Sequence, residues 1–138
     1  MNLRGAGYEA AAVFLLGLTT LLTGCAGPSA GAGGSDLTIV YDEGRGGVVT
    51  TWTLTCDPLG GSHPDAKAGC EALTQNATSA LPAVPADQVC TQKIGGLQTA
   101  SVTGRWNGSD VDSRFTLTNG CEIARWKALT GLLPLAVG

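Results

Sequence analysis

The sequence predicts an α+β domain built on an antiparallel sheet, and three observations support this fold class. Strand-like segments follow one another without the regular alternation of strands and helices that a parallel sheet requires. Asn107-Gly108 joins two alternating segments in the way that a tight hairpin turn does. Four cysteines lie in the part of the chain that we expect to be exported, where disulfides stabilise domains with small cores.

The N-terminal segment 1–24 has the features of a signal peptide of the lipoprotein type. Its apolar run from Ala10 to Leu22 has the length of a signal-peptide core and is short for a membrane span. The run leads into Leu22-Thr23-Gly24-Cys25, which resembles the lipobox of bacterial lipoproteins. In that family the cysteine is lipidated and becomes the first mature residue, so we expect lipidation of Cys25. Cleavage of an ordinary secretory signal close by is the alternative.

Residues 25–35 are rich in glycine, alanine and serine, and we expect them to form a flexible tether. Residues 36–138 have the length of one domain. The net charge of −3 and the scattered basic residues argue against nucleic-acid binding. We therefore expect an extracytoplasmic domain that is secreted or lipid-anchored to the outer face of the cell membrane.

The cysteines of this domain predict two disulfides. Cys56, Cys70, Cys90 and Cys121 are an even number in an exported chain, and they allow three different pairings. A zinc site is the rival interpretation, but the chain has no Cys-x-x-Cys spacing and a single histidine, so we expect no metal. Pairing in sequence order would stabilise the fold by roughly 3 and 3.5–4 kcal/mol for the two loops.

The first half of the domain is predicted to contain two strands, a helix and an extended stretch. Residues 36–42 and 48–56 alternate or are rich in β-branched side chains, which favours strands. A short helix is expected to open at His63-Pro64-Asp65 and to run through Leu73. Residues 80–87 contain two prolines and are expected to be extended over the surface.

The pairing of the hairpin around Asn107-Gly108 is predicted residue by residue. If Trp106 pairs with Ser109, one face of the hairpin becomes apolar and the other polar. The apolar face then carries Ala100, Val102, Trp106, Val111 and Phe115, and the polar face carries the pairs Arg105–Asp110, Thr103–Asp112 and Ser101–Arg114. A further turn is expected at Asn119-Gly120, and residues 122–133 are compatible with either a strand or a helix.

No constellation of residues in the sequence predicts catalysis. A Ser-His-Asp hydrolase would need His63, the single histidine, which lies before a proline in a turn. A place at the surface or at a helix cap is the better interpretation of this residue. The few carboxylates form no pair on a shared buried face, and the paired glycines lack the spacing of a phosphate-binding loop. We therefore expect neither an enzyme nor a bound cofactor.

The most distinctive segment is the polar stretch Thr91-Gln92-Lys93-Ile94-Gly95-Gly96. A disulfide at Cys90 would fix one of its ends, and the other end enters the hairpin. A loop held at both ends loses little conformational entropy on binding, so it suits recognition by a partner. An ordinary loop beside a disulfide is the alternative interpretation.

Several short motifs resemble those of the Streptomyces subtilisin inhibitor family of actinobacteria. They lie between residues 37 and 126 in the family's order and with its cysteine spacing: Thr53-Leu-Thr-Cys56, Gly61-Ser-His-Pro64, Cys70-Glu-Ala-Leu73, Val89-Cys90-Thr91 and Asn119-Gly-Cys-Glu122. The resemblance implies a two-layer sandwich of a five-stranded antiparallel sheet and two helices, with disulfides Cys56–Cys70 and Cys90–Cys121. It also implies an inhibitor of secreted serine proteases, and often a homodimer formed by packing of sheets.

The resemblance further implies that the loop after Cys90 presents a substrate-like scissile bond to a subtilisin-like protease. Counting forward from Cys90 places this bond between Gln92 and Lys93, which we favour because the disulfide fixes the upstream end. Counting back from the Gly-x-Trp motif of the hairpin shifts the bond to Lys93–Ile94, which predicts inhibition of trypsin-like enzymes. Asn119 would hydrogen-bond the backbone of the loop and hold it in shape.

The downstream side of the loop departs from the family's pattern. Ile94-Gly95-Gly96 stand where the family often has an aromatic residue followed by Asp-Pro. We expect the two glycines to soften this side of the loop. A non-inhibitory interaction module of a cell-envelope lipoprotein, built on the same scaffold, is therefore the alternative function.

Overall fold

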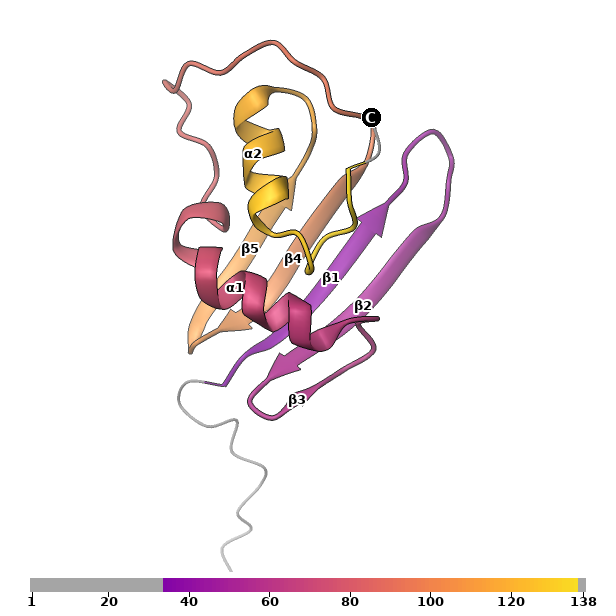
Figure 1. Cartoon of the computed structure of the whole chain (residues 1–138), viewed down its shortest axis with the longest axis vertical. Coiled ribbons are helices and arrows are strands. Elements are labelled where there is room, and N and C mark those ends of the chain that lie inside the picture. Colours follow the sequence, from indigo (N-terminus) through magenta and orange to yellow (C-terminus); the bar gives the residue numbers. More distant parts are fainter. Residues whose placement is uncertain (1–33, 137–138) are drawn as a thin grey trace, which may run out of the picture.

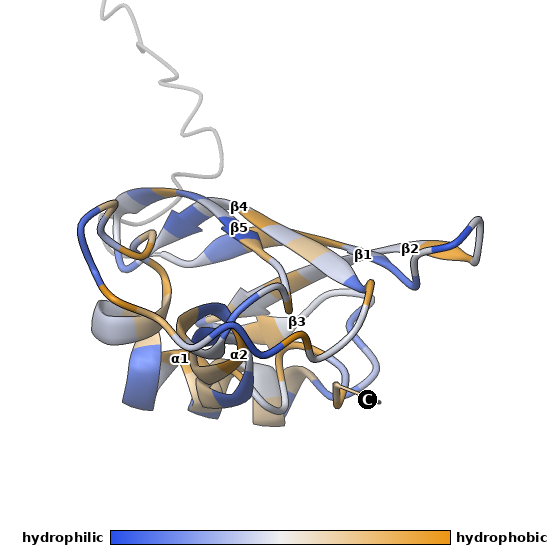
Figure 2. Ribbon diagram, turned by 90° about the horizontal axis from the view of Figure 1, so that it is seen from above, coloured by the Kyte–Doolittle hydropathy of each residue, from blue (hydrophilic) through white to orange (hydrophobic). Residues whose placement is uncertain are grey.

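The computed structural model describes residues 34–136, which form two layers (Figure 1). One layer is a five-stranded antiparallel sheet, and the other consists of two helices that pack on one face of it (Figure 2). This architecture confirms the predicted α+β sandwich. The expected signal peptide, the lipidation site Cys25 and most of the tether lie outside the described residues.

The sheet is built around β1 (Asp36–Asp42). Strands β2 (Val49–Cys56) and β4 (Thr99–Trp106) pair with β1 on either side, and β3 (Leu59–Gly60) and β5 (Ser109–Phe115) form the two edges. Neighbouring strands are antiparallel throughout. The sequence does not predict β3, because a strand of two residues is too short to carry a pattern.

The β4–β5 hairpin has the predicted register in all seven pairs, from Trp106–Ser109 to Ala100–Phe115. Asn107 and Gly108 both have positive φ angles, 48° and 79°, as the predicted type of turn requires. Ala100, Val102 and Phe115 are buried in the core, so the expected apolar face is the face that meets the helices. Ser113 on the same face is also buried, and its hydroxyl donates a hydrogen bond to the Leu81 carbonyl.

Helix α1 (Ala66–Ala80) is longer than expected. The prediction that the helix ends at Leu73 was wrong. The residues after Leu73 are polar or β-branched, so the sequence shows little of the helical pattern there. Ala77 and Ala80 nevertheless continue the buried face of Leu73 at helical spacing. Asp65 begins the helix, since its carboxylate accepts a hydrogen bond from the Ala68 amide.

Helix α2 (Gly120–Ala128) shows that the ambiguous segment 122–133 is helical as far as Ala128, and turns with an isolated β-bridge between Thr130 and Leu133 follow. The turn expected at Asn119-Gly120 was wrong, because Asn119 is the N-cap of this helix. Its side-chain oxygen accepts a hydrogen bond from the Glu122 amide at 2.9 Å. Trp126 is the largest fully buried side chain, and its indole donates to the Pro134 carbonyl. The segment after α2 thus closes the core beneath the sheet.

Both disulfides have the pairing implied by the family resemblance. Cys56–Cys70 joins the end of β2 to α1, and Cys90–Cys121 joins the long segment after α1 to the first turn of α2. Residues 81–98 between α1 and β4 contain no helix or strand. The extended stretch expected for residues 80–87 is only partly present, because Ala80 and Leu81 still have the conformation of the end of α1 and a turn follows in which the Gln88 amide donates to the Pro85 carbonyl.

A buried arginine on α2 connects both helices to the sheet. The guanidinium of Arg125, 8% exposed, donates hydrogen bonds to the carbonyls of Ala80 and Leu81, where α1 ends. It also donates to the Arg114 carbonyl on β5 and to the Glu122 carboxylate at 2.7 Å. Its charged carbon lies 4.6 Å from the centre of the Phe115 ring. One side chain therefore satisfies polar groups from three elements.

We predict that Arg125→Met lowers the free energy of unfolding by about 3–5 kcal/mol. The variant removes the arginine donor of the Glu122 carboxylate and of the Ala80 and Arg114 carbonyls, and it leaves the Leu81 carbonyl with Ser113 as its side-chain donor. Urea unfolding with the disulfides intact measures this change. The double variant Arg125→Met/Glu122→Gln should recover part of the loss, since no buried charge is then left unpaired. A single variant as stable as the wild type would contradict the role of this hydrogen-bond network.

Candidate functional site: the loop between Cys90 and Gly95

The candidate loop lies at one end of the molecule, above the first turn of α2 (Figure 1). The chain leaves α1 at Leu81, crosses this end in an extended conformation, and enters β4 at Thr99. Most of its side chains are exposed, and Val89 is 94% exposed. The loop therefore projects from the body of the domain, while its two ends remain attached to the body.

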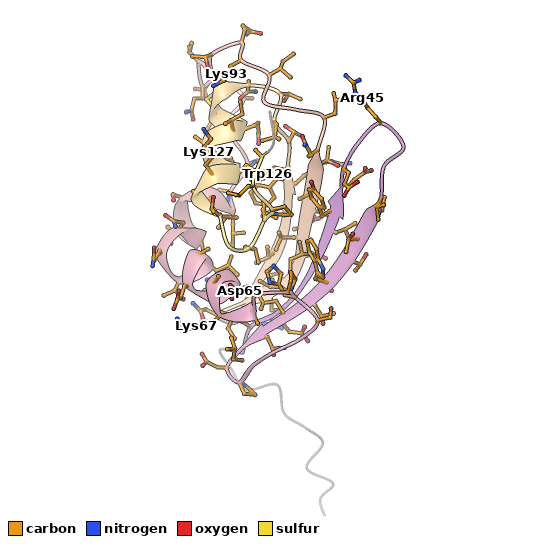
Figure 3. The ribbon with its side chains drawn as sticks, turned by 45° about the vertical axis from the view of Figure 1, so that its right-hand side comes forward. Arg45, Asp65, Lys67, Lys93, Trp126 and Lys127 are labelled. Carbon is orange, nitrogen blue, oxygen red and sulfur yellow. A yellow bond between two sulfur atoms is a disulfide. The ribbon has the colours of Figure 1, made fainter. Side chains whose placement is uncertain are left out.

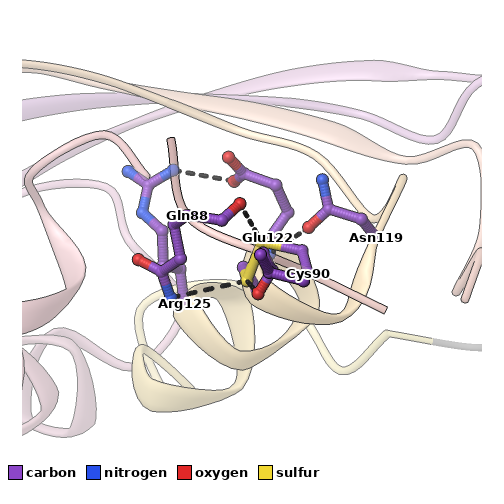
Figure 4. Close-up of a disulfide and its surroundings, with 7 residues drawn as sticks. Gln88, Cys90, Asn119, Glu122 and Arg125 are labelled. Carbon is purple, nitrogen blue, oxygen red and sulfur yellow. Dashed lines mark hydrogen bonds and ion pairs between the residues drawn. A yellow bond between two sulfur atoms is a disulfide. The ribbon is translucent and has the colours of Figure 1, made fainter. Parts of the chain in front are cut away.

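The upstream end is attached to α2 by a covalent bond and a hydrogen bond. The disulfide Cys90–Cys121 brings the two α-carbons to 5.4 Å (Figure 4). The Gly120 amide donates to the Thr91 carbonyl at 3.0 Å. A β-carbon at Gly120 would lie 2.0 Å from the Thr91 hydroxyl oxygen, so glycine permits this close approach.

The downstream end is attached at Gly95. Its amide donates to the Leu117 carbonyl at 2.7 Å. A β-carbon at Gly95 would lie 3.0 Å from the Ile123 side chain and 3.5 Å from that of Leu117. This glycine therefore lets the backbone lie directly on the apolar surface at the start of α2. The expectation that glycines soften this side of the loop is wrong at Gly95, because both a hydrogen bond and close packing hold it.

Two peptide groups lie between these attachment points. The Thr91 carbonyl belongs to the peptide Thr91–Gln92, and the Gly95 amide belongs to the peptide Ile94–Gly95, so both peptides are held by the body of the domain. Gln92, Lys93 and Ile94 between them are exposed, and Ile94 is 71% exposed. Within residues 34–136, no backbone or side-chain hydrogen bond or ion pair involves these three residues. The unattached peptides are Gln92–Lys93 and Lys93–Ile94.

Asn119 supports this arrangement from the side of the helix. Its side-chain oxygen caps α2, and the next residue, Gly120, donates the hydrogen bond to the loop. Glu122 in the same turn is held by Arg125, so the cap, the disulfide and the loop contact share one rigid base. A direct hydrogen bond from the Asn119 amide to the loop backbone stays a prediction.

The β1–β2 turn, residues 43–48, lies beside the downstream end of the loop. Gly44 touches Leu97, since a β-carbon at Gly44 would lie 2.7 Å from the Leu97 carbonyl oxygen. Tyr41 lies in β1 at the base of this turn, and burial, together with Glu43 and Asp42, raises the pKa of its phenol. Tyr41 is therefore neutral at ordinary pH.

His63 has a structural position away from the loop. It is buried, its Nδ1 accepts from the Asp65 amide at 3.1 Å, and its Nε2 lies 2.9 Å from the Leu132 carbonyl oxygen. These contacts assign the proton to Nε2. The hydrogen bond from the Asp65 amide places His63 at the start of α1, close to the expected capping role. Among residues 34–136, no group of three His, Cys, Asp or Glu side chains could hold a metal ion.

A family model described as subtilisin inhibitor-like matches residues 34–119, which is more than half of the chain. The chain belongs to this family. "Subtilisin inhibitor-like protein 1" of Streptomyces cacaoi is 38% identical over 80 residues, covering 55% of this chain and 72% of that protein. "Protease inhibitor SIL-V2" of Streptomyces orinoci is 34% identical over 83 residues, covering 58% of this chain and 75% of that protein.

A third relative and a solved structure are also similar to this chain. "Subtilisin inhibitor" of Streptomyces violaceus is 38% identical over 74 residues, covering 51% of this chain and 50% of that protein. A chain from the crystal structure of Streptomyces caespitosus sermetstatin in complex with Bacillus licheniformis subtilisin gives a TM-score of 0.48 and 25% identity. That match covers 75% of this chain and 100% of the other.

Family membership establishes the class of the protein. The family consists of protease inhibitors rather than enzymes, and its members are secreted. The described residues 34–136 contain no helix long and apolar enough to cross a membrane.

Sequence reasoning missed the residues that form the base of the loop. Gly120, Leu117 and Ile123 provide the donor, the acceptor and the apolar contact. Of these three residues, only Gly120 could have been placed near the loop from the sequence. It precedes Cys121, and a disulfide brings the neighbours of both cysteines together. Leu117 and Ile123 carry no local pattern that relates them to Gly95.

We predict that the amides of Gly95 and Gly120 exchange with solvent slowly and that those of Gln92, Lys93 and Ile94 exchange near their intrinsic rates. The reason is that the first two donate to backbone carbonyls and the others have no acceptor among the described residues. Hydrogen exchange measured by NMR reports each amide. The variant Cys90→Ala/Cys121→Ala should speed exchange at Gly120 more than at Gly95, and equal protection across residues 92–95 would contradict this attachment.

Proposed function

We propose that this chain inhibits subtilisin-like serine proteases by presenting residues 92–94 as a substrate-like segment. One observation supports this proposal above the others: two unattached, exposed peptide groups lie between attachments on both sides. A protease cleft binds an extended chain by adding main-chain hydrogen bonds to it, and this segment has its hydrogen-bonding groups available. Because the segment is already ordered by its attachments, its binding costs little conformational entropy.

The attachments also explain how the presented bond would resist net hydrolysis by the protease. If the protease cleaves the presented bond, the upstream part stays joined to α2 through Cys90–Cys121 and the bond from Gly120 to Thr91. The downstream part stays at the start of the same helix, because Gly95 donates to Leu117 just before α2 and packs on Ile123 in its first turn. The new amine therefore remains near the acyl group, and resealing of the peptide bond competes with hydrolysis.

We place the scissile bond between Gln92 and Lys93. The disulfide holds Cys90, the third residue before this bond, and the hydrogen bond from Gly120 holds Thr91, the second. The alternative, Lys93–Ile94, would direct the Lys93 ammonium into the acidic specificity pocket of a trypsin-like protease. Figure 3 shows Lys93 at the top of the loop, away from the core.

The lipid anchor at Cys25 is also part of our proposal. It is supported by the position of residue 34, where the described chain begins, at the end of the domain opposite to the loop (Figure 1). A tether that enters there would attach the domain at the end away from the loop, so the loop would stay accessible to secreted proteases. The alternative, a non-inhibitory module of the cell envelope, would need no such orientation.

A homodimer formed by sheet packing stays a prediction. The face of the sheet opposite to the helices is mainly polar, with Thr38, Thr51, Thr53, Ser101 and Thr103 at its centre, and its apolar members are Val40 on β1 and Val49 on β2. Interfaces of stable dimers are usually more apolar at their centre. We therefore expect self-association of this chain to be weak.

We predict that the mature domain inhibits subtilisin at micromolar concentration or below, and that Lys93→Ala changes this inhibition little because Lys93 follows the scissile bond. Titration of subtilisin and trypsin with the wild type and with Lys93→Ala tests this. Loss of trypsin inhibition in Lys93→Ala would move the presented bond to Lys93–Ile94.

Mass spectrometry of the reduced, partially cleaved inhibitor gives an independent result. Cleavage at the proposed bond releases a C-terminal fragment that begins at Lys93, and cleavage at the alternative bond releases one that begins at Ile94. Lys67→Ala, which removes a lysine at the far end of the domain, is the matched control (Figure 3). Failure of the wild type to inhibit either protease at micromolar concentration would favour the non-inhibitory module.

We predict that processing of the full-length precursor in a bacterial host is sensitive to globomycin, which blocks the lipoprotein signal peptidase. The variant Cys25→Ser should lose both the sensitivity and the association with membranes, because serine offers no thiol for lipid attachment. Fractionation and immunoblotting measure both effects. Processing that is unaffected by globomycin would instead indicate an ordinary secretory signal.

A further inference from the structure

We propose that the β1–β2 turn, residues 43–48, is a second contact for the protease and that Arg45 pairs there with a protease carboxylate. This inference rests on the proposed inhibitory function and adds a specificity determinant outside the loop. The turn projects from the same end of the molecule as the loop, and Figure 3 shows Arg45 and Lys93 extending from that end.

The size of a protease–inhibitor interface requires a contact of this kind. Such interfaces cover about 800 Å² per partner and about 20–30 residues on each side. The segment 88–94 provides seven residues, of which all but the half-buried Cys90 are exposed, so most of the interface must come from elsewhere. The β1–β2 turn is the neighbour of the downstream end of the loop, because Gly44 touches Leu97 directly.

A hollow of about 560 Å³ lies between the turn and the loop. Glu43, Gly44 and Arg45 line it from the turn, and Ile94, Gly95 and Leu97 line it from the loop. Of the residues that line the hollow, Ile94 and Leu97 are 71% and 51% exposed, and Val48 at the end of the turn is exposed outside the hollow. Exposed apolar side chains gathered around a hollow are typical of a protein-binding surface. The hollow would take an apolar side chain from the protease surface beside the cleft, on the side that receives residues after the scissile bond.

The conformation of the turn presents the Arg45 guanidinium to solvent. Gly44, Arg45 and Gly46 have positive φ angles of 77°, 52° and 73°, and an arginine is unusual in this region. The carboxylates beside it are used within the turn: Asp42 accepts from the Gly44 amide at 2.7 Å, and Glu43 accepts from the Val48 amide at 3.3 Å. Arg45 itself makes no ion pair or hydrogen bond within residues 34–136. A strained position that carries an unused charge at the edge of a binding surface points to recognition of an acidic partner group.

The test compares Arg45→Glu and Arg45→Asn with the wild type against subtilisin and trypsin. Asparagine tolerates the left-handed conformation, so Arg45→Asn removes the charge without new strain. Lys67→Glu makes the same charge change as Arg45→Glu at the opposite end of the domain, where Lys67 pairs with Glu71. Inhibition constants and association rates are measured at low and high salt for whichever protease the wild type inhibits.

We expect Arg45→Glu to weaken inhibition about ten-fold or more and Arg45→Asn about three-fold, mainly through the association rate and less at high salt. Lys67→Glu should stay within about two-fold of the wild type. Hydrogen exchange should also slow at the amides of Arg45 and Gly46 when the protease binds. An Arg45→Glu variant that inhibits as well as Lys67→Glu, or unchanged exchange in the turn, would overturn the second contact alone. A wild type that inhibits neither protease would overturn the proposed function and this inference with it.

Discussion

The loop depends on the buried guanidinium of Arg125, because this group fixes the relative positions of the three elements that support it. Arg125 donates to the end of α1, to β5 and to Glu122 in the first turn of its own helix. The loop segment leaves from the end of α1, and its attachments lie in and just before the first turn of α2. A guanidinium offers five donors in a fixed plane, which lets one side chain impose this geometry on separate backbone segments.

The start of α2 combines several functions that a small domain can place at one helix end. The first amides of a helix have no acceptor within the helix. Here the Glu122 amide donates a hydrogen bond to the Asn119 side chain, and the Gly120 amide donates one to the Thr91 carbonyl. Cys121 adds the covalent attachment, and Ile123 supplies the apolar surface on which Gly95 lies. Both ends of the loop therefore rest on residues 117–123, a short stretch that ends in the first turn of α2. Relative motion of the two ends would require this stretch to deform, which gives the loop its order without a large core.

The parts of the fold that follow from local chemistry could be predicted from the sequence. The β4–β5 register follows from Asn107-Gly108 together with the alternation of flanking side chains, and the disulfides follow from the family's cysteine spacing. The end of α1 could not be predicted, because Ala77 and Ala80 are too small to mark a buried face among polar neighbours. The cap at Asn119 was missed for a related reason: Asn-Gly favours both a turn and a helix start, and tertiary packing decides between them.

The position of the candidate site was predictable from Cys90, but its limits depend on contacts between distant residues. Hydrogen bonds to Gly120 and Leu117 define which peptides are attached, and no local pattern in the sequence relates these residues to the loop.

Two peptides remain unattached, Gln92–Lys93 and Lys93–Ile94. They are the same two bonds that are selected by counting forward from Cys90 and by counting back from the hairpin. Lys93 lies at the centre of this segment and belongs to both bonds. We therefore expect the protease to decide between them: an acidic specificity pocket would select the bond after Lys93, and a pocket that prefers an uncharged side chain would select the bond after Gln92. The two ways of counting thus select neighbouring bonds of one presented segment, and the contacts at its ends are compatible with either bond.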